Sequence, residues 1–208
     1  MPEKFYEKAR RIEKNPDYTF RHFEKKKTEQ YAEDIMNIYN EAWVKHQHHK
    51  GITKQMALNM VKQMKPVMDE KIIWFAYYQQ APIAMFINIP DLNQWFRHLK
   101  GKFNLWHKLY FLWIKLTRPN KKFTGLVFGI IPEFQGKGID AYIIGESAKV
   151  LQSNKMPYTE YEMQWIGDFN PKMLNIAQNL GEVSITRKLA TFRYLFDPTL
   201  PFKRHPIL

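Results

Sequence analysis

Two glycines separated by a lysine, Gly136-Lys137-Gly138, lie where a strand-like run at 123–131 gives way to a helical pattern at 139–153. Glycine adopts positive φ and lets the backbone approach a ligand closely. The free N–H groups and the dipole at the start of a helix favour an anion there. The loop could therefore hold a pyrophosphate, with Lys137 adding charge. Glycine spacing alone favours the alternative, a turn that binds nothing.

The loop belongs to a chain in which short strands and helices alternate. Period-two patterns and β-branched residues predict strands, whereas apolar residues at three- and four-residue steps predict helices. Strands are expected, in chain order, at 18–23, 72–78, 83–89, 123–131, 160–166, 183–188 and 189–196. Helices are expected at 4–14, from Thr28 to Trp43, after an N-cap at Thr53, across 93–117 with a break near Gly101, at 139–153, and at 170–180 before Gly181.

This order predicts an α/β (α+β) fold in which helices flank a mixed central sheet in three layers. Residues 1–208 are expected to form one domain. Within it, we expect residues 1–17 to form a peripheral leader and residues 90–122 to form an aromatic-rich helical insert between the third and fourth strands. Residues 197–208 are expected to be an irregular tail.

Composition narrows the classes of function. The chain carries 32 Lys and Arg against 20 Asp and Glu, a formal charge of +12, which favours an anionic partner such as nucleic acid, membrane phospholipid or a phosphorylated cofactor. The absence of cysteine excludes thiolate catalysis and cysteine-ligated metals. His46, His48 and His49 have no carboxylate nearby, so solvated histidines are favoured and no metal is expected. The N-terminus has no apolar signal core, and a cytoplasmic location without a transmembrane segment is expected.

The run Ile131-Pro132-Glu133-Phe134-Gln135-Gly136-Lys137-Gly138-Ile139 resembles the acetyl-CoA signature of the GNAT acyltransferase superfamily. In that family, a strand ending in a hydrophobic-x-Pro element leads to Gln/Arg-x-x-Gly-x-Gly/Ala at a helix start. The order of elements from Tyr18 to Phe196 also matches the fold. Residues 160–170 carry a Glu-x-x-Trp-Ile-x-x-x-Asn pattern, which is similar to a poorly characterised bacterial GNAT-like group whose members are longer.

By this resemblance, the co-substrate is acetyl-CoA or another acyl-CoA. The backbone amides expected to hold its pyrophosphate are those of Gln135, Gly136, Lys137 and Gly138. The residues expected to line its pantetheine arm are Gly129, Ile130 and Ile131, with Asn170 near the cofactor on the opposite side.

Glu162, in the middle of the strand expected at 160–166, is the candidate catalytic base, because an amine must lose a proton when it attacks a thioester. The alternative, weighed evenly with it, is that Glu162 only pairs with a basic neighbour. Asp91 and Asn93, at the end of the third strand, could reach an acceptor substrate in the same cleft. A turn that uses their side chains is the favoured explanation for these two residues.

Two residues depart from the family pattern. Asp140 stands where the last motif position is usually Gly or Ala, and its carboxylate would repel a phosphate unless it points away. Ala177, four residues before Gly181, stands where many members have a general-acid tyrosine. Either another group serves as the acid, or the thiolate leaves unaided, or the protein binds acyl-CoA without catalysis.

The expected insert mixes aromatic and basic side chains. It could pack on the sheet, on a second subunit or on a missing domain, and packing is the default expectation. It could instead wall an acyl or acceptor pocket as a lid, or lie on an anionic membrane as an amphipathic helix. A peripheral membrane contact and a homodimer therefore both stay open.

The leading hypothesis is acyl transfer, with acetyl as the expected group, from an acyl-CoA to an amine of an unknown acceptor by direct attack in a ternary complex. The rival hypothesis is a non-catalytic acyl-CoA-binding or interaction domain. A nucleic-acid-binding module is suggested by the charge, but the sequence has no helix-turn-helix, zinc or oligonucleotide-binding signature. Nucleic acid is therefore not expected as a partner.

Overall fold

The computed structural model of the protein describes residues 3–43, 50–201 and 207. Its strands are β1 (Tyr18–His22), β2 (Ile73–Tyr78), β3 (Ala81–Pro90), β4 (Lys122–Ile130) and β5 (Glu160–Met163). Its α-helices are α1 (Glu3–Glu13), α2 (Thr28–Trp43), α3 (Lys54–Met64), α4 (Asn93–Phe96), α5 (Leu105–Thr117), α6 (Ile139–Leu151) and α7 (Pro171–Gln178). Short 3-10 helices lie at η1 (Lys25–Lys27), η2 (Glu70–Ile72), η3 (Arg97–Leu99) and η4 (Pro132–Phe134). His46, His48 and His49 lie outside the described residues.

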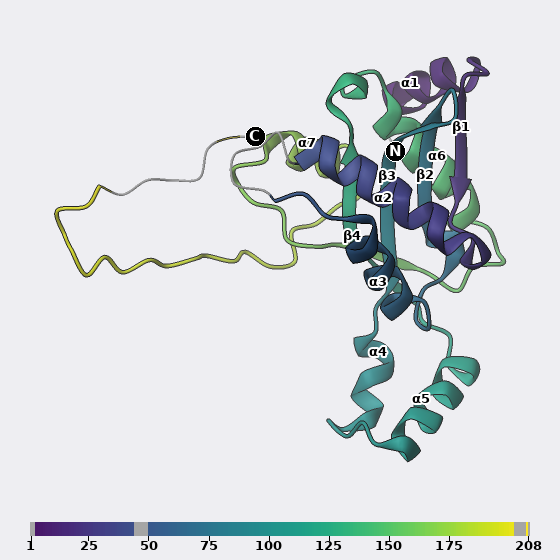
Figure 1. Cartoon of the computed structure of the whole chain (residues 1–208), viewed down its shortest axis with the longest axis vertical. Helices are drawn as coiled ribbons and strands as arrows, with labels where there is room; N and C mark the ends of the chain where they lie inside the picture. Colours follow the sequence, from purple (N-terminus) through teal and green to yellow (C-terminus); the bar gives the residue numbers. More distant parts are fainter. Residues whose placement is uncertain (1–2, 44–49, 202–206, 208) are drawn as a thin grey trace.

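The strands form a mixed sheet in the order β1-β2-β3-β4-β5. Neighbours from β1 to β4 are antiparallel, whereas β5 runs parallel to β4. A parallel neighbour requires a crossover connection, which α6 supplies (Figure 1). The predicted α/β fold, a mixed central sheet flanked by helices, is confirmed.

Helices cover both faces of the sheet (Figure 1). On one face, the Tyr31 ring of α2 lies 4.9 Å from the ring of Phe75 in β2. On the other face, Tyr142 of α6 meets Phe20 of β1 edge-on at 4.1 Å. Because β2 and β3 are covered on both faces, their sequences are nearly continuous apolar runs.

The N-terminal helix α1 packs along α6. Its side chains Ala9 and Ile12 are buried, and Ile12 belongs to the main hydrophobic core. Glu13 also lies 3.5 Å from Lys149 of α6. The segment expected to be a peripheral leader thus adds a buried side chain to the core.

Between β3 and β4 the chain forms a helical hairpin, which we define as residues 91–121 and which contains α4, η3 and α5 (Figure 1). The predicted break near Gly101 is confirmed, since Lys100 and Gly101 both adopt positive φ between the helices. The inward side chains Trp95, Leu99, Phe111 and Ile114 form a separate small core. Val67, after α3, packs against that core and links the hairpin to the body.

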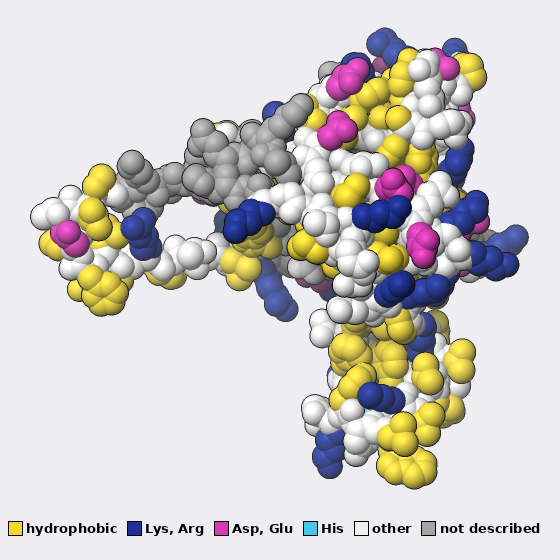
Figure 2. All heavy atoms as spheres, in the orientation of Figure 1, with side chains coloured by type: hydrophobic (Ala, Val, Ile, Leu, Met, Phe, Trp, Pro, Cys, Tyr) yellow, Lys and Arg dark blue, Asp and Glu magenta, His cyan; other side chains and the backbone are white. Residues whose placement is uncertain are grey.

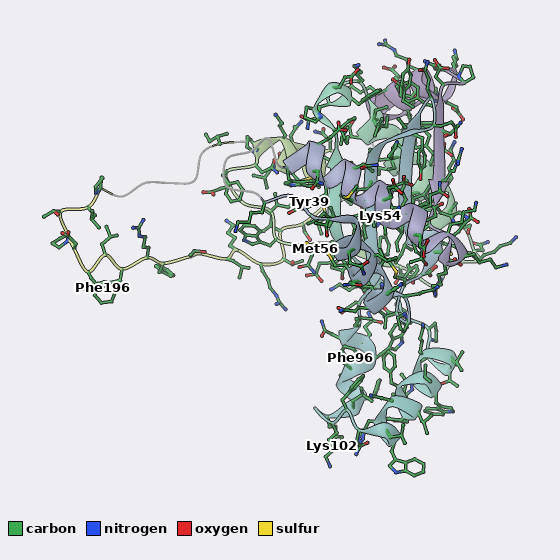
Figure 3. The ribbon with its side chains drawn as sticks, viewed as in Figure 1. Tyr39, Lys54, Met56, Phe96, Lys102 and Phe196 are labelled. Carbon is green, nitrogen blue, oxygen red and sulfur yellow. The ribbon has the colours of Figure 1, made fainter. Side chains whose placement is uncertain are left out.

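The two strands expected at 183–188 and 189–196 are absent, so this prediction was wrong. The segment runs away from the body in an extended path (Figure 1), and Phe196, at its far end in Figure 3, is 94% exposed. The sequence has strand-forming residues there, but a strand also needs an edge to pair with, and an isolated hairpin is marginal in water. β5 likewise ends at Met163, short of the expected Ile166.

Candidate functional site

The predicted strand, loop and helix around the two glycines form as expected. β4 ends at Ile130, and the loop passes through η4 into α6. We call residues 135–138 the glycine loop. Gly136 has a φ of +74° and Gly138 a φ of +94°, values that glycine adopts without strain. The Gln135 side chain secures the turn, because its Nε2 donates to the Ile130 carbonyl at 3.1 Å.

The glycine loop opens onto the start of α6, which has no side-chain cap. The first N–H groups of a helix have no partner within the helix, and the positive end of the helix dipole lies with them. A Cβ at Gly136 would meet no heavy atom within 4 Å, so space is open beside the loop. The arrangement suits an anion.

Two lysines lie beside the glycine loop, one within it and one on α1. The Lys137 ammonium lies 4.7 Å from the centre of the Phe134 ring. Lys8 of α1 also lies beside the loop, since a Cβ at Gly138 would come within 3.4 Å of the Lys8 Cβ. Sequence reasoning missed Lys8, because nothing in the first residues indicates that α1 packs beside this loop.

Halfway along β4, its pairing with the neighbouring strand β5 ends, which leaves an opening in the sheet. β5 pairs with β4 only from Lys122 to Gly125. At the same point, the register with β3 shifts by one residue, so that Leu126 is a β-bulge. Beyond the bulge, no strand among the described residues pairs with the edge of β4 that faces away from β3.

The residues expected to line a pantetheine arm lie at this open edge, in different orientations. Ile131 donates its N–H to the carbonyl of Ile83 in β3 at 3.0 Å. Backbone groups alternate along an antiparallel strand, so Gly129 also faces β3, whereas Phe128 and Ile130 direct their groups toward the opening. Gly129 has a packing role as well, because a Cβ there would lie 2.2 Å from the Trp43 ring.

Glu162 lies on β5 and forms an ion pair with Lys122 of β4. The hydrogen bond between the Lys122 ammonium and the Glu162 carboxylate raises the pKa of Lys122, and the negative charges of Glu162, Asp91 and Glu160 raise it further. The structure therefore places the predicted base Glu162 and the predicted substrate residue Asp91 near one lysine, Lys122. Sequence reasoning had not identified this lysine. The expected alternative, a basic partner for Glu162, is observed.

The turn after β3 has the geometry expected of Asx side chains. The Asp91 carboxylate accepts a hydrogen bond from the Asn93 N–H at 3.1 Å, and the Asp91 carbonyl accepts from the Asn120 side chain at 2.8 Å. Asn93 is the first residue of α4. Asp91 and Asn93 thus fix the root of the hairpin.

The C-terminal part of the expected site lies on α7. Asn170 is the N-cap of α7, and its side-chain oxygen accepts a hydrogen bond from the Met173 N–H at 3.0 Å. Ala177 is buried in the same helix. The hydroxyl of Tyr161 lies against Gly125, close enough to leave no room for a Cβ there, and burial raises its pKa above the ordinary value. Sequence reasoning missed both Tyr161 and the bulge, although a glycine inside a strand is a recognised bulge signal.

Comparisons with known proteins extend this description. No protein-family model matches the chain. The chain is 25% identical over 159 residues to the bacterial ceramide synthase of Caulobacter vibrioides and 24% identical over 166 residues to protein YghO of Escherichia coli. Each alignment covers 74% of this chain and 40% of the relative, so the chain spans less than half the length of these relatives.

Solved acetyltransferases have the same architecture. A possible acetyltransferase from Clostridium difficile superposes with a TM-score of 0.51 at 10% identity, over 86% of this chain and 98% of the other. Aminoglycoside N-acetyltransferase AAC(6')-Iy in complex with CoA superposes with a TM-score of 0.50 at 11% identity, over 85% and 94%. An aminoglycoside 6'-N-acetyltransferase from Acinetobacter haemolyticus gives 0.50 at 15% identity, over 86% and 99%. The chain has the fold of the GNAT acetyltransferases.

Proposed function

We propose that this protein transfers an acyl group from an acyl-CoA to an amine. The observation that carries the proposal is the glycine loop, with Gly136 and Gly138 at positive φ, which opens onto the uncapped start of α6. The opening of β4 lies directly before it in the chain. An acyl-CoA has an anionic pyrophosphate end, which would suit the glycine loop, and an extended pantetheine arm, which would suit the opening beside β4.

The cofactor would bind in two parts. The backbone amides of residues 135–138 would hold the pyrophosphate, with Lys8 and Lys137 adding charge nearby. The pantetheine arm would run along the opening beside Phe128 and Ile130, adding strand-like hydrogen bonds to β4. Asp140 in the first turn of α6 would have to point its carboxylate away from the phosphates.

The chemistry would be direct attack by the amine on the thioester carbonyl. An N–C bond forms, the C–S bond breaks, and the coenzyme A thiolate leaves. The amine proton would pass to Glu162, directly or through water, once this carboxylate is released from Lys122. A backbone N–H at the Leu126 bulge would stabilise the negative charge that develops on the carbonyl oxygen.

The acceptor we favour is a long-chain aliphatic amine. The support is the similarity to a protein named bacterial ceramide synthase, since a ceramide is the amide of a long-chain amino alcohol. That similarity covers 40% of the relative, so the rest of such a protein could complete the acceptor site.

Calorimetric titration with acetyl-CoA and longer acyl-CoAs tests the cofactor site. We expect Gly136→Asp to weaken acyl-CoA binding about tenfold or more, because it puts a carboxylate beside the pyrophosphate. Gly136→Asn is the matched control, because Asn and Asp both tolerate positive φ and only Asp adds charge. The proposal fails if no acyl-CoA binds the unmodified protein, or if the two variants bind equally well.

A thiol-release assay with long-chain amines then separates the enzyme from a binding domain. We expect Glu162→Gln to lower the rate about a hundredfold or more, as loss of a general base does, while acyl-CoA binding is retained. The rival function, acyl-CoA binding without turnover, is favoured by the Glu162–Lys122 pair and by Ala177. Acyl-CoA binding without thiol release from any amine would support that rival.

A further inference from the structure

The helical hairpin exposes an unusual amount of apolar surface. In α5, Leu105 is 70% exposed, Trp106 76% and Leu116 85%. Leu109, Tyr110, Leu112 and Trp113 of the same helix are also exposed. At 100° per residue, these seven side chains cover roughly 160° of the helix surface. A helix that is apolar on nearly every side is normally covered by other material.

This exposure does not come from poor packing of the hairpin. Phe111 and Ile114 of α5 are buried against Trp95 and Leu99. Lys115 donates to the Pro66 carbonyl, which attaches α5 to the end of α3. The outer face of α5 is thus held in a fixed position, and no described residue covers it.

The charge of the hairpin indicates which kind of partner would cover the outer face of α5. The hairpin has one acidic residue, Asp91 at its root, and seven basic ones. The basic residues are Arg97, Lys100, Lys102, Lys108, Lys115, Arg118 and Lys121. Figure 2 shows the hairpin as an apolar projection with basic side chains among its apolar ones. Apolar side chains mixed with positive charge match the interface of an anionic bilayer.

The body of the protein adds a basic surface beside the hairpin. Lys25, Lys26 and Lys27 of η1 line one shallow hollow together with Lys62 and Lys65 at the end of α3. The hollow keeps a positive excess although Glu29 also lines it and Lys27 pairs with Glu24. Lys65 directly precedes Pro66, the residue to which Lys115 of the hairpin is bonded, so the hollow lies next to the root of the hairpin.

We propose that the helical hairpin docks the protein on an anionic lipid bilayer. The tip, where Lys102 lies in Figure 3, and the outer face of α5 enter the interfacial layer. The exposed lysines of the hairpin, such as Lys100 and Lys102, and those of the hollow contact lipid phosphates. α5 lies in the interface, and no helix among the described residues is long and apolar enough to cross the membrane. The proposal does not depend on the acyl transfer proposed above.

Binding to lipid vesicles tests the docking without any acyl-CoA. The protein is sedimented with phosphatidylcholine vesicles that contain or lack phosphatidylglycerol. We expect binding to the anionic vesicles that weakens with salt, and quenching of tryptophan emission by brominated acyl chains. Leu105→Ser/Trp106→Ser should lower the partition coefficient about tenfold or more, and Lys100→Gln/Lys102→Gln should lower it about tenfold.

Two matched controls separate the hairpin from general surface effects. Met56→Ser/Met60→Ser removes two exposed apolar side chains from α3, and Lys155→Gln/Lys172→Gln removes two exposed charges far along the chain. Both should bind vesicles as the unmodified protein does. Because all the substituted side chains are exposed, thermal unfolding midpoints should stay unchanged.

Three results would overturn the proposal. One is the absence of vesicle binding. A second is light scattering that shows a dimer converted to a monomer by Leu105→Ser/Trp106→Ser, which would make α5 an interface between copies. The third is duplex DNA binding that survives moderate salt and is lost in Lys100→Gln/Lys102→Gln, which would assign the basic residues to nucleic acid.

Discussion

Tyr77 of β2 donates a 2.6 Å hydrogen bond to the carboxylate of Asp34 in α2, deep under the helix. Burial raises the pKa of Asp34 above its ordinary value, while the hydrogen bond from Tyr77 opposes that shift. A raised folded-state pKa means that the contribution of Asp34 to stability is full below its unfolded pKa and is lost as pH rises through the folded value. The tyrosine limits that loss.

We expect Tyr77→Phe to lower the free energy of unfolding by about 1–3 kcal/mol near neutral pH, because it leaves a buried carboxylate without its donor. The loss should shrink as the pH falls and Asp34 becomes protonated. Urea unfolding at neutral and acid pH measures both effects. Tyr78→Phe is the matched control, since the Tyr78 ring packs on Tyr18 and Phe134. An equal loss in both variants, or one independent of pH, would contradict this account.

At the scale of elements, the position of α2 over β4 depends on one glycine. A Cβ at Gly129 would lie 2.2 Å from the Trp43 ring at the end of α2. That ring stacks on Tyr39 at 5.2 Å, so it cannot move aside freely. By contrast, Gly145 lies inside α6, and a Cβ there would meet no heavy atom within 4 Å.

Alanine at these two positions should therefore change the free energy of unfolding in opposite directions. Gly129→Ala should lower the free energy of unfolding by about 1–3 kcal/mol through overpacking. Gly145→Ala should raise it by about 0.5–1 kcal/mol, because alanine favours the helix. Denaturant melts of the two variants beside the unmodified protein measure the difference. Destabilisation by Gly145→Ala would show that α6 is packed more tightly there than described.

At the scale of the whole molecule, the two ends of the described chain differ in what they contribute. α1 lies against α6 and places Ile12 in the main core. The segment after α7 extends away from the body (Figure 1), with Ile185, Phe192 and Phe196 each more than 70% exposed. Stability should therefore depend on the first segment and not on the second.

We expect a chain ending at Glu182 to keep the unfolding midpoint of the full chain, because the described residues beyond it bury little apolar surface. Removing residues 1–15 should lower the free energy of unfolding by about 2 kcal/mol or more, since burial of an Ile side chain alone contributes about 1.5–3 kcal/mol. Circular dichroism melts of the three chains give the comparison. A large loss in the chain ending at Glu182 would show that residues 183–208 pack on the body.

The amino-acid sequence by itself determined the order of strands and helices from 18 to 178, the N-cap at Thr53 and the glycine loop. These features depend on local preferences: side-chain periodicity, a hydroxyl that accepts from the Met56 N–H at 3.2 Å, and the freedom of Gly136 and Gly138 to take positive φ. Such preferences depend on residues close together in the chain, so one sequence is enough to predict them.

The tertiary structure alone decided what depends on distant partners. Glu162 meets Lys122 because parallel strands align residues far apart in the sequence, and Lys8 reaches the glycine loop because α1 lies along α6. The strand-forming residues 183–196 stay unpaired, because a strand needs an edge as well as a propensity. The bulge at Leu126 likewise arises from the register between two strands, and it opens the sheet where the acyl arm is proposed to lie.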